Sequence, residues 1–94
     1  METADKLTQS YLKTILKYKD GLLYWKEKRN GINSTYIAGV KTAKKGFWRI
    51  GINGKHYLCH DIIYLMHYGF CPKNIKHKDG NKSNNRILNL QESI

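Results

Sequence analysis

The chain has 94 residues, with 17 Lys or Arg against 7 Asp or Glu, and a formal net charge of +10. This length suits one small domain, and the basic excess indicates a polyanionic partner, first nucleic acid, then acidic lipid or an acidic protein surface. Neither a membrane-spanning run nor a secretory leader is visible, so we expect a cytoplasmic protein without membrane association. Cys59 and Cys71 lack a disulfide or zinc pattern and are expected to be small apolar filler.

The first expected element is an amphipathic helix over residues 7–18. Apolar side chains recur on one side of it at helical spacing, at Leu7, Tyr11, Leu12, Ile15 and Leu16. Asp5 or Thr8 is the candidate cap, and residues 18–21 form the turn that ends the helix. Strands are then expected over 21–26 and 36–40, with a loop over 28–34 between them and a basic turn over 41–46.

A β-hairpin is expected where residues 47–52 and 55–60 flank Asn53-Gly54, a strong signal for a two-residue turn. Such a turn pairs Ile52 with Lys55, Ile50 with Tyr57, and Trp48 with Cys59, which places four core residues on one face. The other face carries Phe47, Arg49, His56, Leu58 and His60. That face either contacts nucleic acid or is a solvated face partly covered by the first helix.

Residues 60–69 predict a largely apolar helix that ends at Gly69 and packs centrally. His60 and His67, both in this segment, are expected to be structural hydrogen-bonding residues. After it, Ile75 and His77 indicate a short strand, Asp79-Gly80 a turn, and Ser83 or Asn84 the cap of a last helix. A histidine at a strand end, beside a helix start and several lysines, suits chemistry on a phosphate.

The segment 72–90 resembles the HNH nucleases of the phage and intron-encoded type. Their ββα-metal motif runs Asp-His-x-(Asn/Asp)-Gly-Asn, then seven residues, then Asn-Leu, and it is matched here at His77, at 79–81 and at 89–90. The resemblance extends back to about residue 18, through Gly21, Leu23, Trp25, Ala38-Gly39, Gly46-Phe47 and Ile50. It departs at Asp61, where the family pattern has Arg.

The resemblance implies that a His activates water against a phosphodiester while one divalent ion stabilises the developing charge. His77 matches this base, and Asn89 matches the Asn that steadies the loop, whereas Asp79 is expected to shape the turn. The ion-binding Asp before the His is Lys76 here, a cation that repels Mg²⁺. The second ligand of the pattern would fall beyond Ile94. We therefore expect no metal site and no cofactor, with Mg²⁺ required only if cleavage is retained.

Two basic clusters are the expected nucleic-acid contacts. One comprises Lys73, Lys76, Lys78, Lys82 and Arg86, and the other comprises Lys41, Lys44, Lys45 and Arg49. Any single Lys could be an ordinary solvated charge, but the excess of basic residues argues against that reading for the whole set. A cation at position 76 could replace a metal-mediated phosphate contact by a direct ion pair.

The expected fold is α+β: an N-terminal helix, a small antiparallel sheet with a hairpin, a central helix and a truncated ββα unit. We divide a single HNH-like domain over 1–94 into a helical arm (1–18), a sheet with the central helix (19–69) and a degenerate ββα unit (70–94). The first functional hypothesis is a phage or mobile-element protein that binds double-stranded DNA in a host bacterial cell and has lost cleavage. The alternatives are a phage inhibitor of a host defence or nuclease protein, such as an anti-CRISPR or anti-restriction protein, and an active HNH nicking endonuclease.

Overall fold

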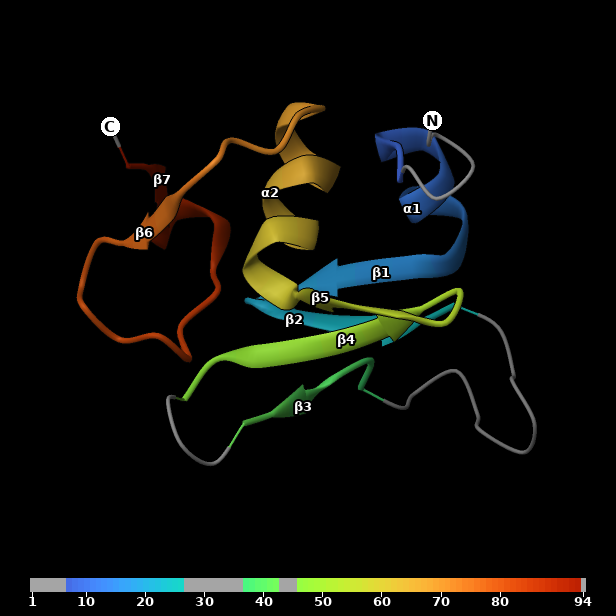
Figure 1. Ribbon diagram of the computed structural model, residues 1–94, viewed down its shortest axis with the longest axis horizontal. Coiled ribbons are helices and arrows are strands. Elements are labelled where there is room, and N and C mark those ends of the chain that lie inside the picture. The colour runs from blue at the N-terminus through green and yellow to red at the C-terminus, as the bar shows by residue number, and fades with distance from the viewer. Residues whose placement is uncertain (1–6, 27–36, 43–45, 94) are drawn as a thin grey trace.

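Two α-helices pack against each other above small antiparallel sheets in the computed structural model, which describes residues 7–26, 37–42 and 46–93 (Figure 1). In chain order the elements are α1 (Gln9–Ile15), β1 (Leu16–Lys19), β2 (Leu22–Trp25), β3 (Val40–Lys41), β4 (Trp48–Ile52), β5 (Lys55–Leu58), α2 (Cys59–Tyr68), β6 (Ile75–His77), the 3-10 helix η2 (Ile87–Asn89) and β7 (Leu90–Glu92). The predicted α+β class is confirmed. None of the described helices is long and apolar enough to cross a membrane.

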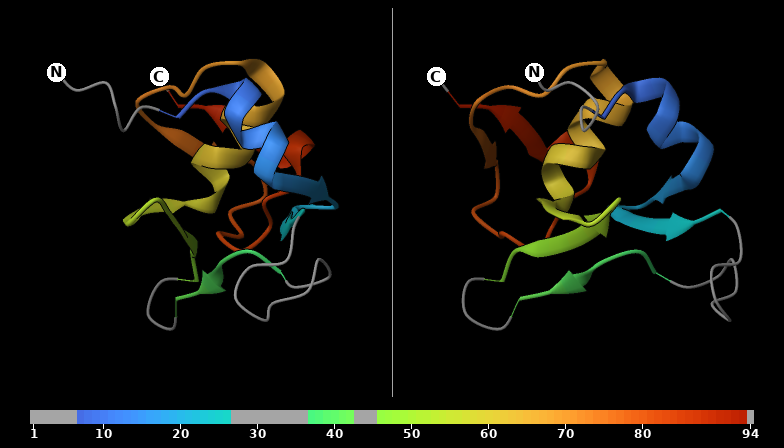
Figure 2. Two further views of the ribbon diagram at one scale, coloured as in Figure 1. Left: turned by 90° about the vertical axis from the view of Figure 1, so that its right-hand side faces the viewer. Right: turned by 45° about the vertical axis from the view of Figure 1, so that its right-hand side comes forward.

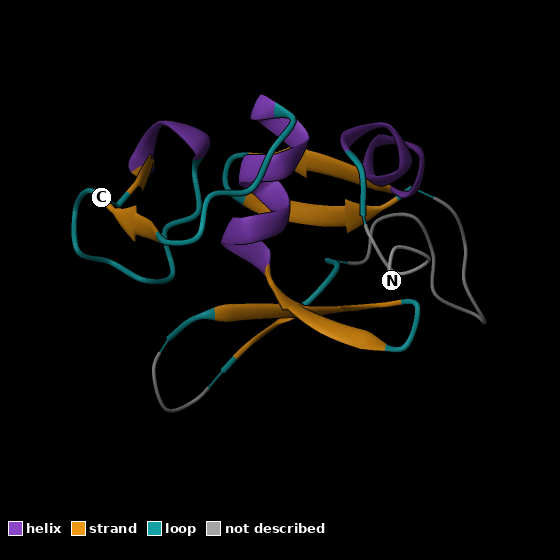
Figure 3. Ribbon diagram, turned by 45° about the horizontal axis from the view of Figure 1, so that its top comes forward, coloured by secondary structure: helices purple, strands orange, loops and turns teal. Residues whose placement is uncertain are grey.

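The strands of the described residues form three separate antiparallel sheets, β1–β2, β3–β4–β5 and β6–β7. Helix α2 lies between α1 on one side and the β6–β7 ribbon on the other (Figures 1 and 3). The second view of Figure 2 shows β4 and β2 below the helices. The core lies where these layers meet, and its most buried side chains include Leu12, Leu16, Leu23, Ile50 and Ile63.

The first predicted helix is too long, because α1 ends at Ile15 and the chain continues as strand β1. Thr8 caps α1 as expected, since its hydroxyl accepts a hydrogen bond from the Tyr11 amide at 3.1 Å. Asp20 and Gly21 have φ values of +50° and +89°, and they join β1 to β2 as a two-residue hairpin. The tight turn therefore lets the strand begin at Leu16. The Leu16 side chain would be buried whether this residue were in a helix or in a strand.

The hairpin of β4 and β5 has the predicted turn at Asn53-Gly54 and the predicted pairs Ile52–Lys55 and Ile50–Tyr57. The expected Trp48–Cys59 pair is wrong, because β5 ends at Leu58 and Cys59 begins α2. The neighbouring strand predicted over 36–40 is found only in part: Ile37 forms an isolated bridge with Tyr24, and β3 begins at Val40.

Helix α2 ends as predicted at Gly69, which adopts the left-handed conformation with φ of +83°. The helix predicted after Ser83 or Asn84 is wrong. Residues 84–86 are irregular, one 3-10 turn follows, and Leu90 begins β7, which pairs with β6. Amide side chains explain the difference, because Asn81 and Asn84 accept hydrogen bonds from the backbone N–H groups of Ser83 and Arg86.

Cys59 is buried in the core as the sequence indicates. Burial raises the pKa of its thiol to about 12, so this side chain is a neutral apolar group at neutral pH. The same expectation is wrong for Cys71, which is exposed in the segment after α2.

Candidate functional site

His77 is half-buried at the end of β6, and both nitrogens of its ring can be assigned from one contact. Its Nε2 lies 2.8 Å from Oδ1 of Asn85. A carbonyl oxygen only accepts a hydrogen bond, so in the neutral ring Nε2 carries the proton and Nδ1 keeps the lone pair. In this tautomer Nδ1 is the ring nitrogen that can accept a proton. The expectation of a helix start beside it is wrong, since the partner is the irregular segment 84–86.

Asn85 was not singled out as a site residue from the sequence, where Ser83 and Asn84 attracted attention as caps. Its side chain is 1% exposed, and its Nδ2 has no partner among the described residues. Buried amides are almost always paired on both sides. Residues 83–85 are all small and polar, so the sequence gives no local signal that Asn85 is the one whose side chain is buried.

His60 is the second side chain that the structure adds to this site. It lies in the first turn of α2 and is 5% exposed, with its ring centroid 5.0 Å from that of His77 and 5.6 Å from that of Phe47. Burial, and secondly the charge of a protonated His77, lower the pKa of His60 from its ordinary value of 6.5 to about 4. His60 is therefore neutral at neutral pH.

The predicted hydrogen-bonding roles of the two helix histidines have different outcomes. His67 is confirmed, because its Nδ1 lies 2.8 Å from the carbonyl oxygen of Ile63. His60 is not, since its Nδ1 is buried without a hydrogen-bond partner in the described part of the chain. Nor is His60 on the outer face of the hairpin, because it belongs to α2 and faces inward. Arg49, His56 and Leu58 of that predicted face are exposed.

Asp79 closes the loop that follows His77. Its Oδ1 accepts hydrogen bonds from the Asn81 amide at 2.8 Å and from Nδ2 of Asn89 at 3.0 Å, and its Oδ2 accepts one from Nδ2 of Asn84 at 2.9 Å. Asn89 also accepts a bond from the Asp79 amide at 3.1 Å. These bonds, that from Asn84 foremost, lower the pKa of Asp79. Both carboxylate oxygens are therefore engaged in holding the loop.

Lys76 points away from His77. It is exposed in the middle of β6 and pairs with Gln91, while its neighbours Ile75 and His77 are half-buried. Successive side chains of a strand alternate between its two faces. The cation at position 76 therefore lies on the solvent face of the β6–β7 ribbon.

The residues around His77 do not fit a divalent ion. Mg²⁺ needs oxygen ligands, but Lys76 has no acceptor and Asp79 has both oxygens committed to the loop. Nowhere in the described ranges do three His, Cys, Asp or Glu side chains gather in a way that could hold a metal.

The segment that carries Lys82 lies against the start of β4. Nζ of Lys82 lies 5.2 Å from the centroid of the Phe47 ring, and the Ser83 hydroxyl donates a hydrogen bond of 2.7 Å to the carbonyl oxygen of Gly46. The described members of the two predicted basic clusters are exposed, namely Lys41, Arg49, Lys73, Lys76, Lys78, Lys82 and Arg86. Lys44 and Lys45 lie outside the described residues.

Comparison with known proteins gives one result for this part of the chain. Residues 57–93 match a family model described as HNH endonuclease. This range contains His60, His77, Asn85 and Asn89. No curated protein and no solved structure matches the chain.

Proposed function

We propose that the protein uses an HNH-like frame, matched over residues 57–93, to bind double-stranded DNA without cutting it. A match to this family implies a nucleic-acid substrate. The observation that carries the loss of cleavage is the commitment of both Asp79 oxygens to the loop while position 76 holds a cation. His77 retains the geometry of a base, but no described carboxylate is free beside it to hold the ion.

Charge supports DNA binding by the β6–β7 ribbon and the loop that follows β6. Lys76 and Lys78 follow each other on the exposed side of the β6 ribbon, and Lys82 adjoins Phe47 at the start of β4. None of these three cations forms an ion pair with a described carboxylate. Unpaired lysines on an exposed loop and strand can approach phosphates and release condensed counterions, which is the main source of sequence-independent affinity for DNA.

The cleavage half of the proposal predicts that supercoiled plasmid stays intact when incubated with the protein and either Mg²⁺ or Mn²⁺. The expected result follows from the missing carboxylate, because a lone His base without metal stabilisation of the leaving oxygen is slow. Agarose electrophoresis measures the nicked fraction. Metal-dependent nicking by the wild type that disappears in His77→Ala would show an active endonuclease and overturn this half.

The binding half predicts electrophoretic retardation of duplex DNA that weakens steeply between about 50 and 200 mM salt. Replacing Lys76, Lys78 and Lys82 together by Gln should reduce the magnitude of the slope of log affinity against log salt by about three, or one for each phosphate contact.

The matched control replaces three exposed lysines from α1, the start of β1 and the end of β2, namely Lys13, Lys17 and Lys26, by Gln. These segments lie on the other side of α2 from the β6–β7 ribbon (Figure 1). The control variant carries the same change in net charge but should keep the slope of the wild type. Equal effects of the two triple variants would leave only a general attraction between a basic protein and DNA, and would contradict an interface at the β6 ribbon.

A further inference from the structure

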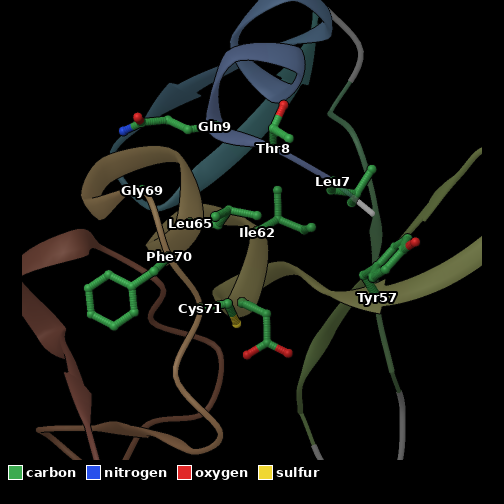
Figure 4. A pocket seen from close by; sticks show the side chains of 10 residues that line it. Leu7, Thr8, Gln9, Tyr57, Ile62, Leu65, Gly69, Phe70 and Cys71 are labelled. Carbon is green, nitrogen blue, oxygen red and sulfur yellow. The ribbon is translucent and has the colours of Figure 1, made fainter. Parts of the chain in front are cut away.

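A cavity of about 600 Å³ lies between the start of α1, helix α2, strand β5 and the segment 69–71 (Figure 4). Its walls are mainly apolar and include Leu7, Tyr57, Ile62, Leu65 and Phe70. This volume is in the range of sites for small molecules, which are typically apolar with few polar groups. The cavity is distinct from the His77 site, because Asp61 lines it whereas the preceding residue, His60, faces Phe47 and His77.

Asp61 is the one acidic residue among the described residues that line this cavity. Its side chain is 37% exposed, and burial raises its pKa, as expected for a carboxylate held partly out of water. Nε2 of His60 lies 3.6 Å from Oδ1 of Asp61, but His60 is neutral at neutral pH. Asp61 therefore has no cationic partner among the described side chains.

Two other features beside Asp61 only partly compensate a negative charge. The Cys71 thiol lies beside the carboxylate and stays neutral, because its pKa is raised, and it donates its hydrogen bond to the carbonyl oxygen of Pro72 at 3.6 Å. Asp61 also lies in the first turn of α2, where the positive end of the helix dipole favours an acid. Neither feature is a counter-ion. A partly desolvated carboxylate in an apolar cavity is stabilised most by a ligand that has a cationic group for the carboxylate and a hydrocarbon body for the apolar walls.

We propose that this cavity binds a ligand with an apolar body and one cationic group, with the cation at Asp61 and the body against Ile62, Leu65 and Tyr57. The ligand class is an alkyl or aryl ammonium or guanidinium. Two sources present this chemistry: a free amine, or an Arg or Lys side chain within an apolar peptide of a partner protein. The site is independent of the proposed DNA-binding function, because it shares no residue with the His77 loop.

Benzylammonium is a suitable probe, with benzyl alcohol as its neutral analogue. Each is titrated into the isotopically labelled full chain while amide chemical shifts are followed. We expect saturable shifts confined to the cavity segments, at millimolar concentration, and about tenfold weaker binding of benzyl alcohol. A capped peptide with one Arg between two Leu residues distinguishes the sources: tighter binding than benzylammonium assigns the cavity to a peptide, and weaker binding assigns it to a free amine.

Asp61→Asn should abolish the preference for benzylammonium over benzyl alcohol, because the amide keeps the shape of the side chain but removes its charge. Glu92→Gln, which removes an exposed carboxylate outside the cavity, is the matched control and should keep the preference. Equal binding of the two probes to the wild-type chain, or no saturable shift with benzylammonium, would overturn the proposal. That comparison needs no variant and decides the question even if Asp61→Asn does not fold.

Discussion

Gly21→Ala should destabilise the protein by roughly 2–5 kcal/mol, of which about 1–2 kcal/mol comes from backbone strain and the remainder from a steric clash. Gly21 has a φ of +89°, a conformation that L-residues rarely adopt. A Cβ atom there would lie 2.9 Å from the backbone nitrogen of Arg86 and 3.2 Å from the carbonyl carbon of Asn85. Backbone atoms cannot rotate out of the way, so the irregular segment 84–86 must move.

The same substitution should also disturb the site, because Asn85 holds Nε2 of His77. The expected signature is a change in the His77 ring resonances together with a lowered free energy of unfolding in urea. Gly54→Ala is the matched control: its φ is +82°, but a Cβ there would meet nothing within 4 Å. It should cost only the strain of about 1–2 kcal/mol and leave the His77 resonances unchanged. Equal losses in the two variants would contradict a close contact between Gly21 and the His77 loop.

Local chemistry explains what the sequence predicted well. The register of β4 and β5 depends on Asn53-Gly54 and on alternation in the flanking residues, and both signals lie within a few positions of each other. Asp20-Gly21 is an equally good turn signal, but Leu12 and Leu16 also fit the stripe of a helix. Since Leu16 is buried in either conformation, its burial pattern could not decide between helix and strand.

The candidate site was predicted only in part, because its decisive contacts join residues far apart in the chain. The motif around His77 predicted a candidate base and the Asp79–Asn89 loop, and the hydrogen-bond partners in that loop lie close in sequence. His60 and Phe47 contact His77 because α2 and the start of β4 pack beside the β6–β7 ribbon in the folded chain. No periodicity within a segment encodes such a contact, and a short polar run does not show that Asn85 turns into the core.

Acidification from about pH 7 to about pH 4.5 should lower the free energy of unfolding through His60, by up to about 3 kcal/mol if no other group compensates. The pKa of His60 is about 4 in the folded protein and 6.5 when exposed. Between these values the unfolded chain binds more protons than the folded one. Stability therefore rises with pH across this window and levels off above it. Asp61, whose folded pKa is raised, opposes this trend and reduces the net loss.

His60→Gln removes the titrating group and should flatten the dependence of unfolding free energy on pH between about 4 and 6.5. His56→Gln is the matched control, because His56 is exposed on β5, and it should keep the slope of the wild type. Asp79 does not confuse the test, since its lowered pKa confines its own contribution to pH values below the ordinary 3.8. Ring resonances of the wild-type histidines give an independent readout. A His60 midpoint near 6.5 would show that the ring is solvated, and the packing of His60 between Phe47 and His77 would then be wrong.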